Sequence, residues 1–247
     1  MFARSRVSLR LAATVVVLCF GVVALAGCSN TAEKSAGYSA TDTSTEASSG
    51  ATTDTADPAQ EGALYTPTYA PTGSEIAVIK TSKGTIKVKL FGKDAPIHVG
   101  NFVELAQKGF YDKVKFHRLE PGFVIQGGDP QTSELSGEQV VELVNAQKSG
   151  VYKDGQPMLG TGGPGYAIKG EFDPAKNPNK HVDGSLAMAR SQSPDSGGSQ
   201  FYFTLGPQSF LDGQYTVFGQ TSDGLDIVHK LGVGDEILSV TIENASK

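Results

Sequence analysis

The amino-acid sequence predicts a mainly β fold, because short strand-like segments and glycine turns outnumber helical segments over most of its length. From about residue 74 onward, apolar runs alternate with turns marked by Gly and Pro. Before that point the chain is rich in Ser, Thr and Ala and has little to bury. We therefore expect one folded domain over residues 74–247, either a closed β-barrel or a sandwich. The pattern alone leaves these two open.

The N-terminus has the layout of a secretory signal, in which basic residues precede an apolar run. Arg4, Arg6 and Arg10 come before the apolar run from Leu11 to Ala26. That run is shorter than the ~20 residues that a membrane-spanning helix needs. A cleaved leader is therefore favoured over a permanent anchor.

The end of this run, Leu25-Ala26-Gly27-Cys28, resembles the lipobox of bacterial lipoproteins. The resemblance implies a signal peptide over residues 1–27 and a diacylglycerol group on Cys28. Two acyl chains hold a protein firmly at a membrane, so we expect an extracytoplasmic protein that is lipid-anchored to the cell membrane through Cys28. The alternative is a soluble secreted protein in which Cys28 is incidental.

Residues 28–73 are predicted to form a flexible linker, since their composition lacks the apolar periodicity that repays the entropy of ordering. Both cysteines, Cys19 and Cys28, precede the folded region. Neither a disulfide nor a cysteine zinc site is therefore expected within the domain.

Charge and histidine spacing narrow the range of ligands. The formal net charge is -5 and Lys and Arg do not cluster, which argues against a nucleic-acid partner. The four histidines show no spacing typical of metal ligands. We expect no metal, no cofactor and a monomeric protein.

The domain is predicted to begin with a hairpin of residues 75–80 and 85–90, because the second segment alternates apolar residues with lysines. A helix follows over residues 95–108, with Asp94 as its N-terminal cap and Gly109 as its stop. The remaining elements are short. Strands are expected at residues 114–119, 123–126, 185–189, 200–205, 216–219 and 237–242, and a brief helix at residues 225–231.

Residues 116–130, FHRLEPGFVIQGGDP, resemble the signature of the cyclophilin family of peptidyl-prolyl cis-trans isomerases. Three further segments agree in the same order: GGPGY at 162–166, GSQFY at 198–202 and FLDG at 210–213. The resemblance spans about residues 74–245. It implies a closed eight-stranded antiparallel β-barrel capped by two α-helices.

The resemblance also implies an active site. Its catalytic residues fall on Arg118 and on Gln126, which binds the substrate backbone and orients the arginine. The substrate-binding residues implied are Phe123, Val124, Ala189, Tyr202, Phe210, Leu211 and Tyr215.

Four of these positions depart from the best-known members of that family. Val124 stands where Met is common, Tyr202 where Phe is usual, Phe210 where many members have Trp, and Tyr215 where many have His. The absence of the Trp indole donor argues against tight cyclosporin binding. It leaves the expected catalytic centre in place.

The chemistry of X–Pro rotation suits a fixed cation. Rotation breaks amide resonance at a barrier of about 20 kcal/mol, and a donor aimed at the twisted nitrogen favours the transition state. A planar guanidinium at Arg118 fills that role better than a lysine. No general base is needed, so His117 is expected to be structural, and Glu171 and Asp173 are interpreted as surface-loop residues.

An insertion is predicted between Pro130 and Gly160, where short bacterial cyclophilins have almost no chain. Ser136 and Glu138 begin a predicted helix with an apolar side. We hypothesise that this insertion, residues 131–159, borders the substrate groove and restricts which chains enter. An inert surface excursion is the alternative.

The function expected is acceleration of X–Pro rotation in exported proteins as they fold. The alternative is a low-activity, membrane-tethered chaperone module that holds proline-containing exported polypeptides. A lipid-anchored solute-binding protein is a third interpretation, but it needs a larger two-lobed α/β body than this chain offers.

Overall fold

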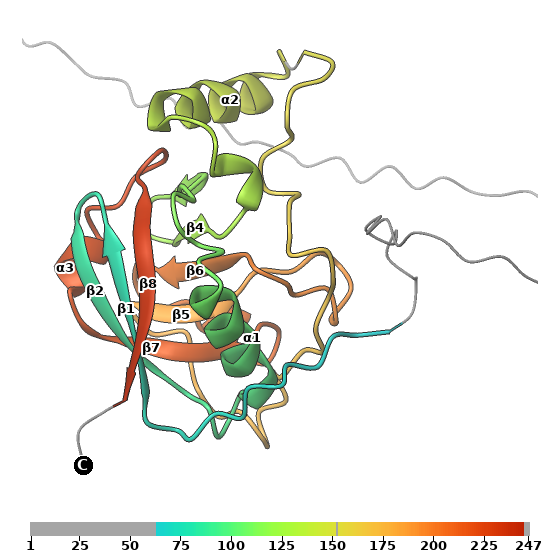
Figure 1. Cartoon of the computed structure of the whole chain (residues 1–247), viewed down its shortest axis with the longest axis vertical. Coiled ribbons are helices and arrows are strands. Elements are labelled where there is room, and N and C mark those ends of the chain that lie inside the picture. The colour runs from blue at the N-terminus through green and yellow to red at the C-terminus, as the bar shows by residue number, and fades with distance from the viewer. Residues whose placement is uncertain (1–62, 152, 245–247) are drawn as a thin grey trace, which may run out of the picture. The chain divides into compact units, whose positions relative to one another are not determined.

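The computed structural model of the chain describes residues 63–151 and 153–244 (Figure 1). The expected signal peptide, Cys28 and most of the expected linker lie outside these residues. Within the described part of the chain, no helix has the length and apolar character needed to span a bilayer.

The described residues form eight strands, three α-helices and two short 3₁₀ helices, and a strand lies at each predicted place. In chain order they are β1 (Glu75–Thr81), β2 (Gly84–Leu90), α1 (Pro96–Gln107), β3 (Arg118–Glu120), β4 (Val124–Gly127), η1 (Pro130–Thr132), α2 (Gly137–Ser149), β5 (Ser185–Met188), β6 (Phe201–Thr204), η2 (Ser209–Leu211), β7 (Val217–Asp223), α3 (Leu225–Val228) and β8 (Ile237–Asn244).

The strands make one curled antiparallel sheet in the order β3-β4-β6-β5-β7-β2-β1-β8 (Figure 1). The sheet is open, and the prediction of a closed barrel is wrong, because the end strands β3 and β8 do not pair with each other. β3 spans only three residues, half of the strand predicted at 114–119. The chain just before it joins β8 through a single bridge between Lys115 and Glu236 and through irregular backbone hydrogen bonds, such as Lys113 N–H to Ile237 O at 2.8 Å.

The main hydrophobic core lies between the sheet and α1. Phe102 of α1 packs against Phe201 of β6 and Phe218 of β7, with ring centroids 5.8 and 5.5 Å apart. All three side chains are fully buried, and burial of aromatic area is a large stabilising contribution. Since successive strand side chains point to opposite faces, Tyr202 beside Phe201 is directed to the other face of the sheet.

The N-terminus of α1 is stabilised by Glu171 rather than by Asp94, which corrects the prediction. Ala95 is the N-cap and provides no side-chain bond. The Glu171 carboxylate accepts hydrogen bonds from the backbone N–H groups of Ile97 and His98, at 3.0 and 2.9 Å, while Asp94 accepts from Asn179 instead. Glu171 is therefore a structural cap and not a surface-loop residue, because its charge meets the unpaired donors of the helix.

Residues 63–73, assigned above to the linker, lie on the domain. The buried carboxylate of Glu104 in α1 accepts hydrogen bonds from the Tyr65 hydroxyl and from the backbone N–H groups of Thr68 and Tyr69. Burial alone would raise the pKa of Glu104, but these donors outweigh it and lower the pKa to about 2. The folded unit thus starts upstream of residue 74.

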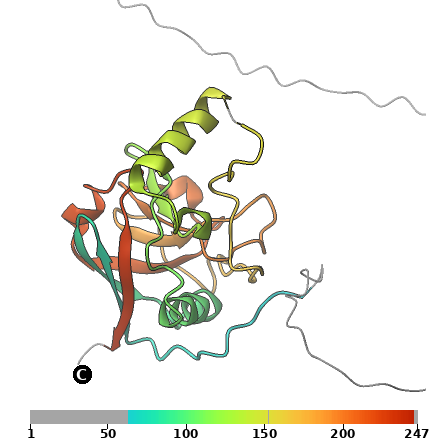
Figure 2. The same ribbon diagram turned by 45° about the horizontal axis from the view of Figure 1, so that its top comes forward.

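The insertion contains the predicted helix, α2, which projects from the sheet in both views of the domain (Figures 1 and 2). Ser136 caps it, and Ser136 and Gln139 form a reciprocal capping box. Its first residue, Gly137, packs against Gly234, where a Cβ would lie 2.5 Å from the Gly234 carbonyl oxygen. The absence of a side chain at Gly137 lets the helix approach the turn before β8 this closely.

Both ends of the insertion meet at Asp129, which is fully buried. Its carboxylate accepts from the backbone N–H of Gln131 at 2.9 Å and from the backbone N–H groups of Gly160 and Gly162. The excursion therefore leaves and re-enters the domain at one fixed point.

Candidate active site

A row of side chains crosses the face of the sheet opposite the main core. Arg118 of β3 pairs with Gln126 of β4, Gln126 with Tyr202 of β6, and Tyr202 with Ala187 of β5. Directly paired residues point to the same face. The neighbouring residue Ile125 points the other way and is fully buried in the main core. Strand register therefore brings a guanidinium and a carboxamide beside a tyrosine.

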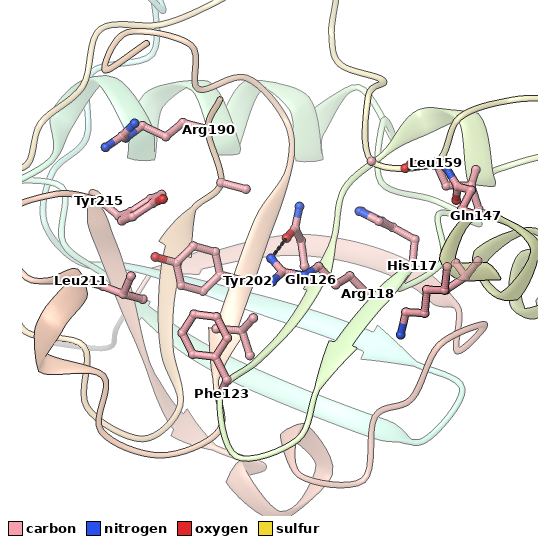
Figure 3. Close-up of a pocket in the computed structure, with 15 residues that line it drawn as sticks. His117, Arg118, Phe123, Gln126, Gln147, Leu159, Arg190, Tyr202, Leu211 and Tyr215 are labelled. Carbon is pink, nitrogen blue, oxygen red and sulfur yellow. Dashed lines mark hydrogen bonds between the residues drawn. The ribbon is translucent and has the colours of Figure 1, made fainter. Parts of the chain in front are cut away.

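These side chains line a cavity of about 490 Å³ (Figure 3). All but one of the predicted catalytic and substrate-binding residues contribute to its lining. Those that do are Arg118, Phe123, Val124, Gln126, Ala189, Tyr202, Leu211 and Tyr215. The exception, Phe210, does not line the cavity and is 61% exposed. It stacks on Phe123 with ring centroids 5.6 Å apart, so it contacts the site through that ring.

One end of the cavity is an apolar cup. Val124, Tyr202 and Leu211 form a second buried cluster, separate from the main core, against which Phe123 and Tyr215 pack. An apolar, partly enclosed surface of this kind can hold a ring-sized aliphatic group, because removing such a group from water is favourable.

Arg118 lies at the edge of this cup (Figure 3). Its guanidinium donates a long hydrogen bond of 3.4 Å to the Gln126 side-chain oxygen and lies 6.0 Å from the centroid of Phe123. Glu120 is 3.6 Å away, but that pair is roughly half exposed, so water weakens it. The guanidinium keeps donors free for a ligand in the cavity.

Gln126 is held in turn by a polar chain behind it. Its side-chain N–H donates to Gln200 at 2.9 Å, and Gln200 donates to the carbonyl of Gly162 at 2.7 Å. Gly162 lies in the glycine-rich turn that follows the insertion. The acceptor offered to Arg118 therefore lies on β4 and is held by Gln200, just before β6, and by the turn at Gly162.

The Tyr202 hydroxyl has a buried partner that the sequence did not indicate. It lies 3.1 Å from Nε2 of His181, and Nδ1 of His181 lies 2.9 Å from Asp212. Burial raises the pKa of Tyr202 well above its usual value, so the phenol stays neutral. Burial lowers the pKa of His181, and the contact with Asp212 only partly offsets this.

His117 also lines the cavity, next to Gly160. It is 5% exposed, and neither ring nitrogen has a hydrogen-bond partner of ordinary geometry among the described residues. Burial lowers its pKa, the charge of Asp129 opposes that shift and the charge of Arg118 adds to it. The ring is therefore held neutral beside the cavity.

Arg190 lines the cavity from the far side, directly after the predicted residue Ala189. Its guanidinium lies 4.5 Å from the ring centroid of Tyr215 and donates to backbone carbonyls, including that of Gln214. A second cavity of about 470 Å³ adjoins the first and shares Arg190 and Gln126 with it.

The insertion supplies the last part of the lining. Val144, Gln147 and Lys148 of α2 and Leu159 of the following segment face the same cavity as Arg118. The insertion therefore borders the cavity, as the hypothesis required. Whether it is functionally inert stays open. Its effect on substrate entry stays a hypothesis.

No metal-binding cluster occurs among the residues that the structure describes: no three His, Cys, Asp or Glu side chains gather in a way that could hold an ion.

The described residues thus form a curled antiparallel β-sheet domain with a guanidinium at the rim of a partly apolar cavity. The family model described as cyclophilin type peptidyl-prolyl cis-trans isomerase/CLD matches residues 76–246. The chain belongs to this family.

Individual relatives agree with this assignment. The chain is 43% identical over 168 residues to a peptidyl-prolyl cis-trans isomerase of Synechococcus elongatus, a match that covers 67% of this chain and 94% of that protein. It is 42% identical over 171 residues to one of Helicobacter pylori, covering 68% and 87%. The crystal structure of a Cryptosporidium parvum cyclophilin type peptidyl-prolyl cis-trans isomerase superposes with a TM-score of 0.54 at 26% identity, over 70% of this chain and 99% of that one.

Proposed function

We propose that this chain accelerates the cis-trans rotation of X–Pro bonds, with the proline ring in the apolar cup and Arg118 facing the amide nitrogen. The observation that carries the proposal is the position of Arg118, which meets Gln126 across β3 and β4 at the rim of the cavity formed by Phe123 and Tyr202. We infer the activity from the family and from the relatives, and we infer its location from the cavity.

The reaction needs stabilisation of a twisted amide and no covalent step. The barrier of about 20 kcal/mol arises from amide resonance, and a twisted nitrogen regains a lone pair that can accept a hydrogen bond. The guanidinium of Arg118 is always charged and planar, so it provides a donor without a proton-transfer step. An acceleration of about 10⁵-fold requires roughly 7 kcal/mol.

Gln126 acts as a positioning and binding residue in this proposal. Its oxygen faces Arg118 and its nitrogen is tied to Gln200. A donor whose direction is fixed before the substrate twists loses little free energy by reorganising, which is the main advantage of an enzyme site over water.

The direct test compares the native chain with Arg118→Ala on a proline-containing peptide. Interconversion is measured by exchange NMR, which needs no coupled protease. We expect kcat/KM to fall by about 10²- to 10³-fold, as for other preorganised donors. The matched control, Lys176→Ala, removes an exposed cation that does not line the cavity, and its rate should equal the native rate.

Equal rates for the native chain and Arg118→Ala would reject catalysis by this residue. If the native chain also failed to speed the refolding of a proline-limited protein while still binding its peptides, the module that binds without turnover would be the correct interpretation.

We further propose that the protein acts outside the cytoplasm on proline-containing exported polypeptides, held at the membrane by a lipid on Cys28. The support is the basic and apolar leader and the lipobox-like segment that ends at Cys28. Cys28→Ser should move the protein from the membrane fraction to the soluble fraction and abolish labelling by a radioactive fatty acid. Unchanged labelling of the variant would refute the anchor.

A further inference from the structure

The wall that the insertion adds to the cavity is rigid. Val140 of α2 is fully buried, and Val144 and Leu159 join the same apolar cluster, with Val233 packed against it. The capping box at Ser136 and the tie to Asp129 fix the two ends. The backbone that carries the cavity-side residues of this wall is therefore fixed before any substrate binds.

Figure 3 shows where this wall lies. Gln147 and Leu159 occupy the end of the cavity opposite Leu211, beyond His117. If the proline ring occupies the apolar cup, a residue close to it in the substrate sequence reaches this end.

The charge lining the cavity is positive, although the whole chain carries a net charge of -5. Arg118, Lys148 and Arg190 are its charged residues, and no Asp or Glu lines it. Lys148 is exposed and forms no ion pair within the described part of the chain. Lining charge of one sign attracts a ligand of the other sign and disfavours one of the same sign.

His117 provides a second, independent observation. Neither of its buried ring nitrogens has a hydrogen bond of ordinary geometry among the described residues, and the nearby side chain of Gln200 only partly offsets the effect of burial on its pKa. A buried donor without an acceptor is costly. An anionic oxygen in this end of the cavity would meet the Lys148 ammonium beside the neutral His117 ring.

We propose that His117 and Lys148 form a subsite for an acidic side chain, so that preferred substrates carry Asp or Glu within two residues of the isomerised X–Pro pair. This deepens the proposed function and rests on it, since the subsite extends the groove that would hold the proline. The insertion then acts as a specificity element rather than as a barrier to entry.

The test uses peptides with one common X–Pro core and with Glu, Gln or Lys placed in turn at each of the two positions before and after the pair. Rates are measured by exchange NMR for the native chain, Lys148→Glu and Lys153→Glu. The last variant is the matched control, because Lys153 is an exposed lysine of the same insertion that does not line the cavity.

We expect the native chain to favour Glu over Lys at one flanking position by about two- to fivefold in kcat/KM, the range of an exposed ion pair. Lys148→Glu should reverse that order, and Lys153→Glu should keep it. Equal rates for Glu and Lys peptides in the native chain, or a preference that survives Lys148→Glu, would overturn the subsite.

The same measurements separate this inference from the proposed function. If the native chain does not accelerate even the Gln peptides, the isomerase proposal fails. The dissociation constants of the Glu and Lys peptides, obtained by titration, then still decide the subsite: a Glu preference that Lys148→Glu removes supports it, and equal constants reject it.

Discussion

The hydroxyl of Tyr202 lies 3.1 Å from Nε2 of the buried His181, so a residue that lines the cavity is joined to the interior of the domain. The Asp212 carboxylate lies 2.9 Å from the other ring nitrogen of His181, and it also accepts a hydrogen bond from the backbone N–H of His181. The aromatic wall of the cavity is therefore oriented by a hydrogen-bonded chain and not by packing alone.

Tyr202→Phe should lower the free energy of unfolding by about 1–2 kcal/mol, because it leaves a buried nitrogen of His181 without a partner. Urea denaturation measures this. Tyr215→Phe is the control, since no hydrogen bond of the Tyr215 hydroxyl occurs among the described residues, and its effect should stay within about 0.5 kcal/mol. Equal stability of Tyr202→Phe and the native chain would show that the His181 contact contributes nothing.

Gln126→Leu should reduce kcat more than it raises KM, because it removes the acceptor that orients Arg118. A lost hydrogen bond to a charged group corresponds to a fall of about ten- to hundredfold. Gln126→Glu keeps the acceptor and should recover part of kcat. If Gln126→Leu changed only KM, Gln126 would be a binding residue without influence on Arg118.

Stability should fall as the pH is lowered through 6.5. Burial lowers the pKa of both His117 and His181 below the ordinary value of 6.5, so the unfolded chain takes up protons at a pH where the folded chain does not. The free energy of unfolding then decreases with falling pH. Urea denaturation at a series of pH values between about 8 and 5 measures the slope, and a flat profile would contradict burial of neutral histidines.

Glu104→Gln should loosen residues 65–69 without changing isomerase activity. The carboxylate accepts from Tyr65, Thr68 and Tyr69, and the neutral amide cannot accept all of these bonds. We expect faster hydrogen exchange of the backbone in that segment. Glu142→Gln, an exposed site on α2, should leave the exchange unchanged.

The lowered pKa of Glu104, about 2, adds a pH signature. Its contribution to stability is complete above its ordinary value of 4.5 and is lost as the pH falls from there towards 2. The stability difference between the native chain and Glu104→Gln should therefore shrink over that range. A difference that stays constant down to pH 2 would contradict the role of the carboxylate.

Local patterns were sufficient where the determinant is local. The hairpin of β1 and β2 follows from alternating residues, and α2 begins directly after Ser136, whose capping box reaches only to Gln139. The cap of α1 could not be found in this way. Glu171 lies more than 70 residues from the helix end that it stabilises, and the nearby Asp94 was the only candidate that a local rule could supply.

The same distinction applies to the cavity. The motif-bearing residues, such as Arg118 and Gln126, line one cavity and lie in one signature segment, and their catalytic role stays a prediction. His181 and Lys148 were missed as parts of the site, since His181 acts through a bond to Tyr202 and Lys148 reaches the cavity only because the insertion folds back over it. Closure of the barrel was overestimated because segment 114–119 reads as a regular strand, whereas β3 covers only its end.

Asp129 fastens the chain on both sides of the insertion, through Gln131 on one side and Gly160 and Gly162 on the other. These bonds fix both ends of the insertion close together at the sheet. The insertion, residues 131–159, is therefore a segment that could be replaced as a unit. A helix with different side chains could be inserted between the two segments that Asp129 holds. Such a change would alter the side chains that line the cavity and leave the strands of the sheet unchanged.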